Sequence, residues 1–435
     1  MNLVEQLKYS GMIAQISSED DLLQHLESGS RSVYCGFDPT ADSLHIGNLV
    51  PLLALKKFQM AGHKPILLMG GATGIIGDPS GRDSERELQT LEAVEKQMNS
   101  IRLQAKEFLD FDCGQNSAIL VNNLDWISEI NVIDYLRDIG KHFSVNSMMQ
   151  KESVRRRIVN QSQGISYTEF SYMILQSYDY LVLNRKYQCT VQIGGSDQWG
   201  NIISGIDLIR RSEGRSAFAI TYPLITRADG TKLGKSTGGS IWLDKKKTSP
   251  FGFYQYWLNV SDDEALRYLA LFTLLEKEEM LKLSDEHKKN PGNRSAQKVL
   301  AAEVTKLVHG RGELLQAERI TSALFESKIA ALRKEDFEQL SIDGMQKTLL
   351  GEDRTLLNAL VISGLAQTPK GEVTIGQARK LIQGKSITIN GKKITDTKAT
   401  LEKADGLYGK YFLIQKGKKT HHLLFVTLKI LQHAS

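Results

Sequence analysis

The sequence predicts an α/β fold with a parallel sheet in its first half, then an all-helical segment and a small α+β domain. Short apolar runs alternate with amphipathic helical stretches up to about residue 226, as in the crossover units of parallel sheets. From residue 227 to 326, helical patterns follow one another without a strand signal. From residue 369 onward, Gly-Lys turns join one helical pattern to strand patterns. We therefore expect domains at 1–226, 227–326 and 369–435, with a partly helical linker at 327–368.

Four apolar runs in the first half predict strands, and the stretches between them predict helices. The runs are SVYCGF from Ser32, KPILLM from Lys64, AILVNN from Ala118 and CTVQIGG from Cys189. Helical spacing covers residues 48–60, 84–109 and 168–183. Because crossover units bring ligands to the carboxyl ends of their strands, we expect the chemically active residues to follow these runs.

The second half predicts four helices and a small tail domain. The helical patterns cover residues 249–259, 261–272, 277–287 and 292–310, and Ser249, Ser261 and Asn293 suit N-cap positions. In the tail we expect a helix at 375–383, a strand at 387–390 and a hairpin that turns at 416–420.

The composition indicates a soluble globular protein. Of the 435 residues, 41% are hydrophobic and 24% are charged. No apolar run of about 18 residues predicts a membrane span, and the first residues lack the pattern of a secretory signal. The three cysteines form no close pair, which disfavours a disulfide framework or a zinc site. We expect a cytoplasmic protein with no membrane partner and no structural metal.

The positive charge is concentrated in the tail. Residues 369–435 hold 13 Lys and Arg against 4 Asp and Glu, whereas the rest of the chain holds 42 against 46. This asymmetry is typical of an appended module that binds a polyanion such as nucleic acid. A solvated basic surface without a partner is the alternative.

A candidate nucleotide-binding turn follows the first predicted strand, in YCGFDPTADSLHIGN from Tyr34. Thr40 and His45 carry donors that suit phosphate oxygens, and the start of the next helix adds partial positive charge. Gly47 would let a nucleotide approach the backbone closely. His45 taken alone would more often be a structural surface residue, but the whole string at a strand-to-helix junction favours nucleotide binding.

A glycine-rich loop in the middle of the chain, TRADGTKLGKSTGGS from Thr226, carries Lys232 and Lys235. Two ammonium groups on such a loop can follow negative charge from an α-phosphate to a departing pyrophosphate. A single lysine-glycine loop is usually solvated surface. Together with the upstream turn, it predicts activation of a carboxylic acid by ATP.

These two motifs resemble the HIGH and KMSKS signatures of class I aminoacyl-tRNA synthetases. Asn48 replaces the second histidine of the first signature, and Leu233-Gly234 replace Met-Ser in the second. Asn48 still offers a hydrogen-bond donor and both lysines are kept, so the resemblance implies an active enzyme. The implied catalytic residues, which act by positioning and charge stabilisation, are Thr40, His45, Asn48, Lys232 and Lys235.

Further residues narrow the resemblance to tyrosyl-tRNA synthetases of the bacterial type, over essentially the whole chain. YTEFSYMILQSYDY places Tyr172, Gln176 and Asp179 on one helical face, and GGSDQWGN follows another predicted strand. The resemblance implies a Rossmann-like catalytic domain, a helical domain on the anticodon side and a small RNA-binding domain. It also implies that L-tyrosine is activated with ATP to tyrosyl-adenylate and then transferred to the 3′ end of tRNA(Tyr).

The resemblance assigns roles to the site residues. Tyr34 and Asp179 would bind the substrate phenol, and such a pair would reject phenylalanine because its polar groups would be left unpaired. The other implied tyrosine contacts are Asp78, Tyr172, Gln176 and Gln198. The implied ATP and adenylate contacts are Gly36, Asp38, Gly47, Gly195, Asp197 and Lys235. Mg²⁺ would accompany ATP and pyrophosphate.

The resemblance also implies tRNA contacts and a homodimer. KESVRRRI offers Arg155 and Arg156 to an acceptor stem, although solvated surface explains this patch about as well. The tail resembles an RNA-binding domain first recognised in a small-subunit ribosomal protein. Its candidates for backbone phosphates are Arg379, Lys380, Lys385, Lys392 and Lys393. The stretch 124–139 builds a dimer interface in the family, yet on the sequence alone it could equally be core.

Three other functions remain as alternatives. A tryptophan-selective relative is disfavoured by the Tyr34 and Asp179 pair. A catalytically inactive RNA chaperone or splicing helper is disfavoured because His45, Lys232 and Lys235 are intact. A ligase that acts on something other than tRNA would need neither the basic tail nor the helical domain.

Overall fold

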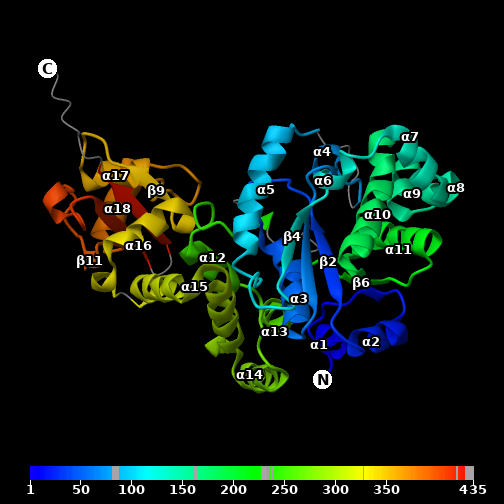
Figure 1. Cartoon of the computed structure of the whole chain (residues 1–435). Helices are drawn as coiled ribbons and strands as arrows, with labels where there is room; N and C mark the ends of the chain where they lie inside the picture. Colours follow the sequence, from blue (N-terminus) through cyan, green and yellow to red (C-terminus); the bar gives the residue numbers. More distant parts are fainter. Residues whose placement is uncertain are drawn as a thin grey trace. The chain divides into compact units, whose positions relative to one another are not determined.

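The computed structural model describes residues 1–80, 88–159, 164–226, 233, 235–236, 239–326, 328–417 and 420–426. The chain divides into two compact units (Figure 1). The first unit contains residues 1–243 and 260–300, and the second contains residues 244–259 and 301–435.

The first unit is built on a six-stranded sheet in the order β1-β6-β5-β2-β3-β4. β2 to β6 run parallel, and β1 pairs antiparallel with β6 at one edge. The strands are β1 (Gln15–Ile16), β2 (Ser32–Phe37), β3 (Lys64–Met69), β4 (Ile119–Asn122), β5 (Cys189–Gly195) and β6 (Phe218–Tyr222). The predicted parallel sheet and its four strands are confirmed, while β1 and β6 were not among the predicted strands.

Helices cover both sides of this sheet. α10 (Tyr167–Tyr187) packs against α11 (Trp199–Glu213), and Figure 1 shows this pair on one side with α5 (Leu91–Ala105) on the other. α3 (Leu49–Met60) follows β2. The other helices of the unit are α1 (Leu3–Tyr9), α2 (Glu19–Glu27), α4 (Thr73–Ile76), α6 (Leu124–Ile127), α7 (Val132–Asp134), α8 (Val145–Met149), α9 (Glu152–Val159), α13 (Asp262–Phe272) and α14 (Lys277–Lys289).

The strand order fixes where a ligand can bind. From β2 the chain moves outward to β3 and β4, then returns to β5 on the opposite side of β2 and continues to β6. The order therefore reverses between β2 and β5, and loops diverge there at the carboxyl ends of the strands. Buried side chains such as Tyr34, Ile66 and Leu183 form the core beneath this point.

The second unit combines helices with a five-stranded sheet in the order β11-β10-β12-β13-β9. Its strands are β9 (Lys347–Leu349), β10 (Ile387–Ile389), β11 (Lys392–Lys393), β12 (Tyr411–Lys416) and β13 (Thr420–Phe425). Its helices are α12 (Pro250–Leu258), α15 (Ser295–Phe325, from residue 301), α16 (Lys334–Gln339), α17 (Leu356–Ile362) and α18 (Ile375–Gln383). β9 and α17 come from the stretch predicted as a linker, and Leu356 and Leu360 share one core with Ile382 and Phe412.

The predicted helix starts are only partly correct. Ser249 and Ser261 accept hydrogen bonds from Gly252 N and Glu264 N, as N-caps do. Asn293 was predicted wrongly as a cap. It ends a short 3₁₀ turn, Pro291–Asn293, and the left-handed Arg294 (φ 53°) separates that turn from α15. Within the described residues, no helix has both the length and the apolar character that a membrane span requires.

Candidate active site

The candidate site lies where four parallel strands end. Asp38 follows β2, Gly70 follows β3, Asn123 follows β4, and Gly195 is the last residue of β5. The Gly70 backbone lies directly against the Asp38 side chain, because a Cβ at Gly70 would lie 2.0 Å from Asp38 Oδ1. The sheet thus brings together residues that are far apart in the sequence.

A hydrogen-bonded network links Asp179 to Tyr172 through this edge of the sheet. Asn123 Nδ2 donates to Asp179 Oδ2 at 3.0 Å and also to Thr73 Oγ1 at 3.0 Å. Thr73 Oγ1 donates in turn to Asp38 Oδ1 at 2.7 Å, and the Tyr172 hydroxyl donates to Asp38 Oδ2 at 2.7 Å. Trp126 Nε1 adds a second donor to Asp179, at 2.8 Å from Oδ1. Every one of these side chains is buried or half-buried.

Tyr34 and Asp179 form a buried polar pair. The Tyr34 hydroxyl makes no hydrogen bond within the described part of the chain, although its side chain is 1% exposed. Burial raises its pKa, and the nearby Asp179 charge raises it further. Burial also raises the pKa of Asp179 to about 7, against the lowering effect of the Asn123 and Trp126 donors. A buried hydroxyl without a partner is costly, so this pair is suited to a ligand that brings its own donor and acceptor.

A second network joins Asp78, Gln198 and Gln176. Gln198 Nε2 donates to Asp78 Oδ2 at 2.6 Å, and Ser80 N donates to Asp78 Oδ1 at 2.9 Å. Asn201 Nδ2 lies 2.9 Å from Gln176 Oε1 and 3.3 Å from Gln198 Oε1. Carboxylate and amide oxygens gathered in this way suit an ammonium group.

The His45 turn is held by its own side chains. Gly47 N donates to His45 Nδ1 at 3.0 Å, and His45 N donates to Asn48 Oδ1 at 3.0 Å. Burial lowers the pKa of His45, so its ring is neutral near pH 7. A Cβ at Gly47 would lie 2.8 Å from the His45 ring, which explains the glycine. The Asn48 oxygen is used for capping, while its amide nitrogen makes no hydrogen bond to any described residue.

Comparison with known proteins identifies this arrangement. Residues 27–326 match the model of the class I tRNA synthetases for tryptophan and tyrosine. Residues 336–424 match the model of the SYY-like C-terminal domain of tyrosine–tRNA ligase. A tyrosine–tRNA ligase of Aliivibrio fischeri (strain MJ11) is 51% identical over 422 residues, which cover 97% of this chain and 98% of that protein. The chain belongs to the tyrosyl-tRNA synthetase family.

Other members of the family agree with this assignment. A tyrosine–tRNA ligase of Escherichia coli (strain 55989 / EAEC) is 51% identical over 423 residues, covering 97% of this chain and 98% of that protein. Among solved structures, a C-terminally truncated mitochondrial tyrosyl-tRNA synthetase of Aspergillus nidulans superposes with a TM-score of 0.67 at 30% identity. That similarity covers 74% of this chain and 94% of the truncated protein.

Some predicted residues of the synthetase site stand apart from the two networks. Thr40 and Gly36 are exposed, and a Cβ at Gly195 would lie 2.4 Å from Asp197 Oδ1. Lys232 lies outside the described residues, and Lys235 is described only by its backbone, as the first residue of β7 (Lys235–Ser236). β7 pairs with β8 (Gly239–Ser240).

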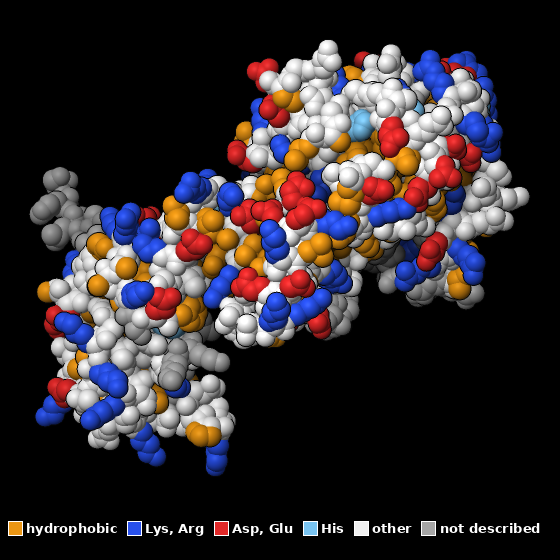
Figure 2. Space-filling view, turned by 90° about the horizontal axis from the view of Figure 1, so that it is seen from below, with side chains coloured by type: hydrophobic (Ala, Val, Ile, Leu, Met, Phe, Trp, Pro, Cys, Tyr) orange, Lys and Arg blue, Asp and Glu red, His pale blue; other side chains and the backbone are white. Residues whose placement is uncertain are grey.

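The candidate tRNA contacts are exposed basic residues. Arg155 and Arg156 lie exposed on α9, whereas their neighbour Arg157 is buried and paired with Glu169 at 2.9 Å. In the second unit, Figure 2 shows more Lys and Arg than Asp and Glu side chains on the visible face. The predicted phosphate contacts there are all exposed: Arg379, Lys380, Lys385, Lys392 and Lys393.

Sequence reasoning missed three residues whose hydrogen bonds hold Asp38 and Asp179 in the first network. Thr73 was not singled out, Asn123 was read only as the end of a strand, and Trp126 was assigned to core or interface. One signal was available for Asn123, since a polar pair directly after an apolar run marks the carboxyl end of a strand. Among the described residues, no group of three or more His, Cys, Asp and Glu side chains could hold a metal ion.

Proposed function

We propose that this synthetase activates L-tyrosine with ATP and transfers it to tRNA(Tyr). The observation that carries the proposal is the unpartnered Tyr34 hydroxyl beside the Asp179 carboxylate. A substrate phenol would accept a hydrogen bond from Tyr34 and donate one to Asp179. Phenylalanine would leave both groups buried and unpaired, so binding would select tyrosine.

The other end of the amino acid would lie against the second network and the Tyr172 hydroxyl of the first. Asp78, Tyr172 and Gln176 would hold its ammonium group, and Gln198 would face its carboxylate. This orientation would direct the carboxylate toward the carboxyl ends of β2 and β5, where the His45 turn begins. The amino acid and ATP would thereby meet at the point where the strand order reverses.

Adenylate formation would rest on positioning and charge. The tyrosine carboxylate attacks the α-phosphate of ATP, and pyrophosphate leaves with Mg²⁺. Thr40, His45, Asn48, Lys232 and Lys235 would stabilise the charge that builds up on the phosphates. Gly36, Asp38, Gly47, Gly195 and Asp197 would line the adenylate pocket. In the second step, the terminal ribose hydroxyl of tRNA attacks the acyl carbon and AMP leaves.

We propose that the exposed basic residues bind tRNA. Arg155 and Arg156 would contact the acceptor stem, and the basic residues of the second unit would contact phosphates elsewhere on the tRNA. The relevant module includes more than residues 369–435, because β9 pairs with β13 in its sheet and α17 shares its core. A truncation at residue 369 would cut through that core, so a boundary near residue 336 is the sharper test.

We also propose a homodimer and a cytoplasmic location. Six large apolar side chains near α7, α8, α9 and the start of α10 are more than half exposed: Val132, Ile133, Leu136, Val145, Val159 and Tyr167. Exposed apolar residues in such number mark an association surface rather than core. A second copy of the chain would cover them symmetrically.

Two assays test the proposed function. Exchange of labelled pyrophosphate into ATP should be fastest with tyrosine, and tryptophan and phenylalanine should support it only weakly. Residues 1–335 should retain exchange and lose tRNA charging. Absence of exchange would leave the inactive RNA chaperone as the better account, whereas exchange with undiminished charging would show that residues 336–435 are not needed for tRNA binding.

A further inference from the structure

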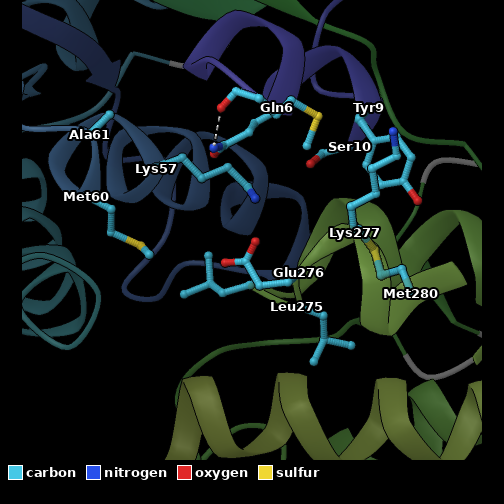
Figure 3. Close-up of a pocket in the computed structure, with 12 residues that line it drawn as sticks. Gln6, Tyr9, Ser10, Lys57, Met60, Ala61, Leu275, Glu276, Lys277 and Met280 are labelled. Atoms are coloured by element: carbon cyan, nitrogen blue, oxygen red, sulfur yellow. Dashed lines mark hydrogen bonds between the residues drawn. The ribbon is translucent and has the colours of Figure 1, made fainter. Parts of the chain in front are cut away.

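A pocket at the C-terminal end of α3 lies apart from the site at the start of that helix. It has a volume of about 190 Å³ and is lined by α1, the last turn of α3 and residues 274–280 (Figure 3). Because α3 has 12 residues, its two ends lie roughly 18 Å apart. The volume exceeds the space that one water molecule needs, so the pocket can hold a small molecule.

Two opposite charges face each other in this pocket without being joined. Figure 3 shows the Lys57 ammonium and the Glu276 carboxylate pointing toward one another. The Lys57 ammonium group makes no hydrogen bond or ion pair with any described residue. Burial lowers its pKa, and the Glu276 charge opposes that effect.

Each charge is stabilised by its own helix end. Lys57 is in the last turn of α3, where the helix dipole favours a cation. Glu276 immediately precedes α14, where the dipole favours an anion. The two groups can therefore stay ionised and separated. The Glu276 side chain also takes part in the capping box of α14 with Glu279, and its carboxylate has further lone pairs for a ligand.

The remaining walls of the pocket combine polar side chains, Gln6 and Ser10, with adaptable apolar ones. Met60, Leu275 and Met280 line it, and the flexible methionine side chains can adjust to different shapes. The other cation, Lys277, lies over the Tyr9 ring with its Nζ 5.1 Å from the ring centre. Lys57 is thus the ammonium group directed at Glu276.

We propose that this pocket binds a free α-amino acid with an aliphatic side chain. The ligand carboxylate would bind Lys57, its ammonium group would bind Glu276, and its side chain would lie against Met60 and Met280. Both polar contacts join opposite charges and are therefore stronger than neutral hydrogen bonds. A simple carboxylic acid or a simple amine could satisfy only one of the two groups.

Calorimetric titration of the full chain tests the proposal. The catalytic site is first filled with a non-hydrolysable tyrosyl-adenylate analogue, so that it cannot contribute heat. L-Leucine is the probe, and 4-methylpentanoate and 3-methylbutylamine are the matched ligands that lack its ammonium or its carboxylate. Leucine should bind at least tenfold more tightly than either.

Single variants separate the two contacts. Lys57→Met should lower the affinity for leucine at least tenfold and leave the affinity for 3-methylbutylamine unchanged. Glu276→Gln should lower the affinity for leucine to that of 4-methylpentanoate. Lys56→Met, at a neighbouring lysine that does not line the pocket, is the control and should bind leucine normally. No binding at millimolar leucine, equal affinities for the three ligands, or normal binding by Lys57→Met would overturn the proposal.

Discussion

The indole N–H of Trp126 donates a hydrogen bond to Asp179 Oδ1 at 2.8 Å across 53 residues of sequence. Together with Asn123, it orients the carboxylate that we assign to the substrate phenol. A hydrogen bond to a charged group contributes about 1.5–3 kcal/mol.

Trp126→Phe should raise KM for tyrosine by about tenfold or more, because Asp179 loses a donor and its orientation. Pyrophosphate exchange at varied tyrosine measures the effect. The weak activation of phenylalanine, which has no hydroxyl for Asp179, serves as the internal control and should not fall. An equal loss for both amino acids would point to a general packing defect.

Asp179 should make stability depend on pH. Its pKa of about 7 lies above the ordinary value of 3.8, so the folded state holds a proton that the unfolded state releases between about pH 4 and 7. The contribution of Asp179 to the free energy of unfolding is therefore fully present at low pH and is lost as the pH rises through 7. The loss amounts to at most about 4 kcal/mol.

Asp179→Asn isolates that contribution. Urea unfolding of the ligand-free protein should show wild type losing stability relative to the variant between pH 5 and pH 8, since asparagine does not titrate. Parallel pH profiles for the two proteins would show that Asp179 titrates normally.

Arg156→Gln and Arg157→Gln should behave oppositely, although the residues are adjacent. Arg156 is exposed, so its variant should weaken tRNA binding, reduce the dependence of affinity on salt and change unfolding much less than Arg157→Gln does. Arg157 is buried against Glu169, so its variant should lose about 3–5 kcal/mol of stability. Filter binding at several salt concentrations and thermal unfolding distinguish the two outcomes.

Lys235→Ala should slow adenylate formation by about 10²- to 10³-fold and change tyrosine affinity little, because its charge would act on the phosphates. Single-turnover kinetics and equilibrium dialysis with tyrosine provide the two measurements. Comparable losses in rate and affinity would contradict a role limited to the transition state.

The sequence predicted the parallel sheet well because its central strands are continuous apolar runs. β2 and β3 begin and end where their runs do. β6 was missed because FAITY is short and follows a polar stretch, and β1 has only two residues. The alternation of apolar and polar residues cannot identify strands as short as these.

The sequence identified several residues of the candidate site, but not the hydrogen bonds that join them to one another. Tyr172, Asp38 and Asp179 could be found from strand ends and helical spacing. Their contacts with Thr73 and Asn123 depend on how β3 and β4 lie beside β2, which is a tertiary property. The linker at 327–368 was predicted from its charged character, while the apolar residues of α17 complete a core that only the folded tail reveals.

The selectivity of Tyr34→Phe tests the central claim most directly. The measurement is the ratio of kcat/KM for tyrosine to that for phenylalanine in pyrophosphate exchange. Tyr180→Phe is the matched control, because its hydroxyl is also buried but already donates to Phe218 O at 2.9 Å. We predict that the ratio falls about tenfold in Tyr34→Phe and stays unchanged in Tyr180→Phe. An unchanged ratio in Tyr34→Phe, or equal losses in both variants, would contradict the assignment of Tyr34 to the substrate phenol.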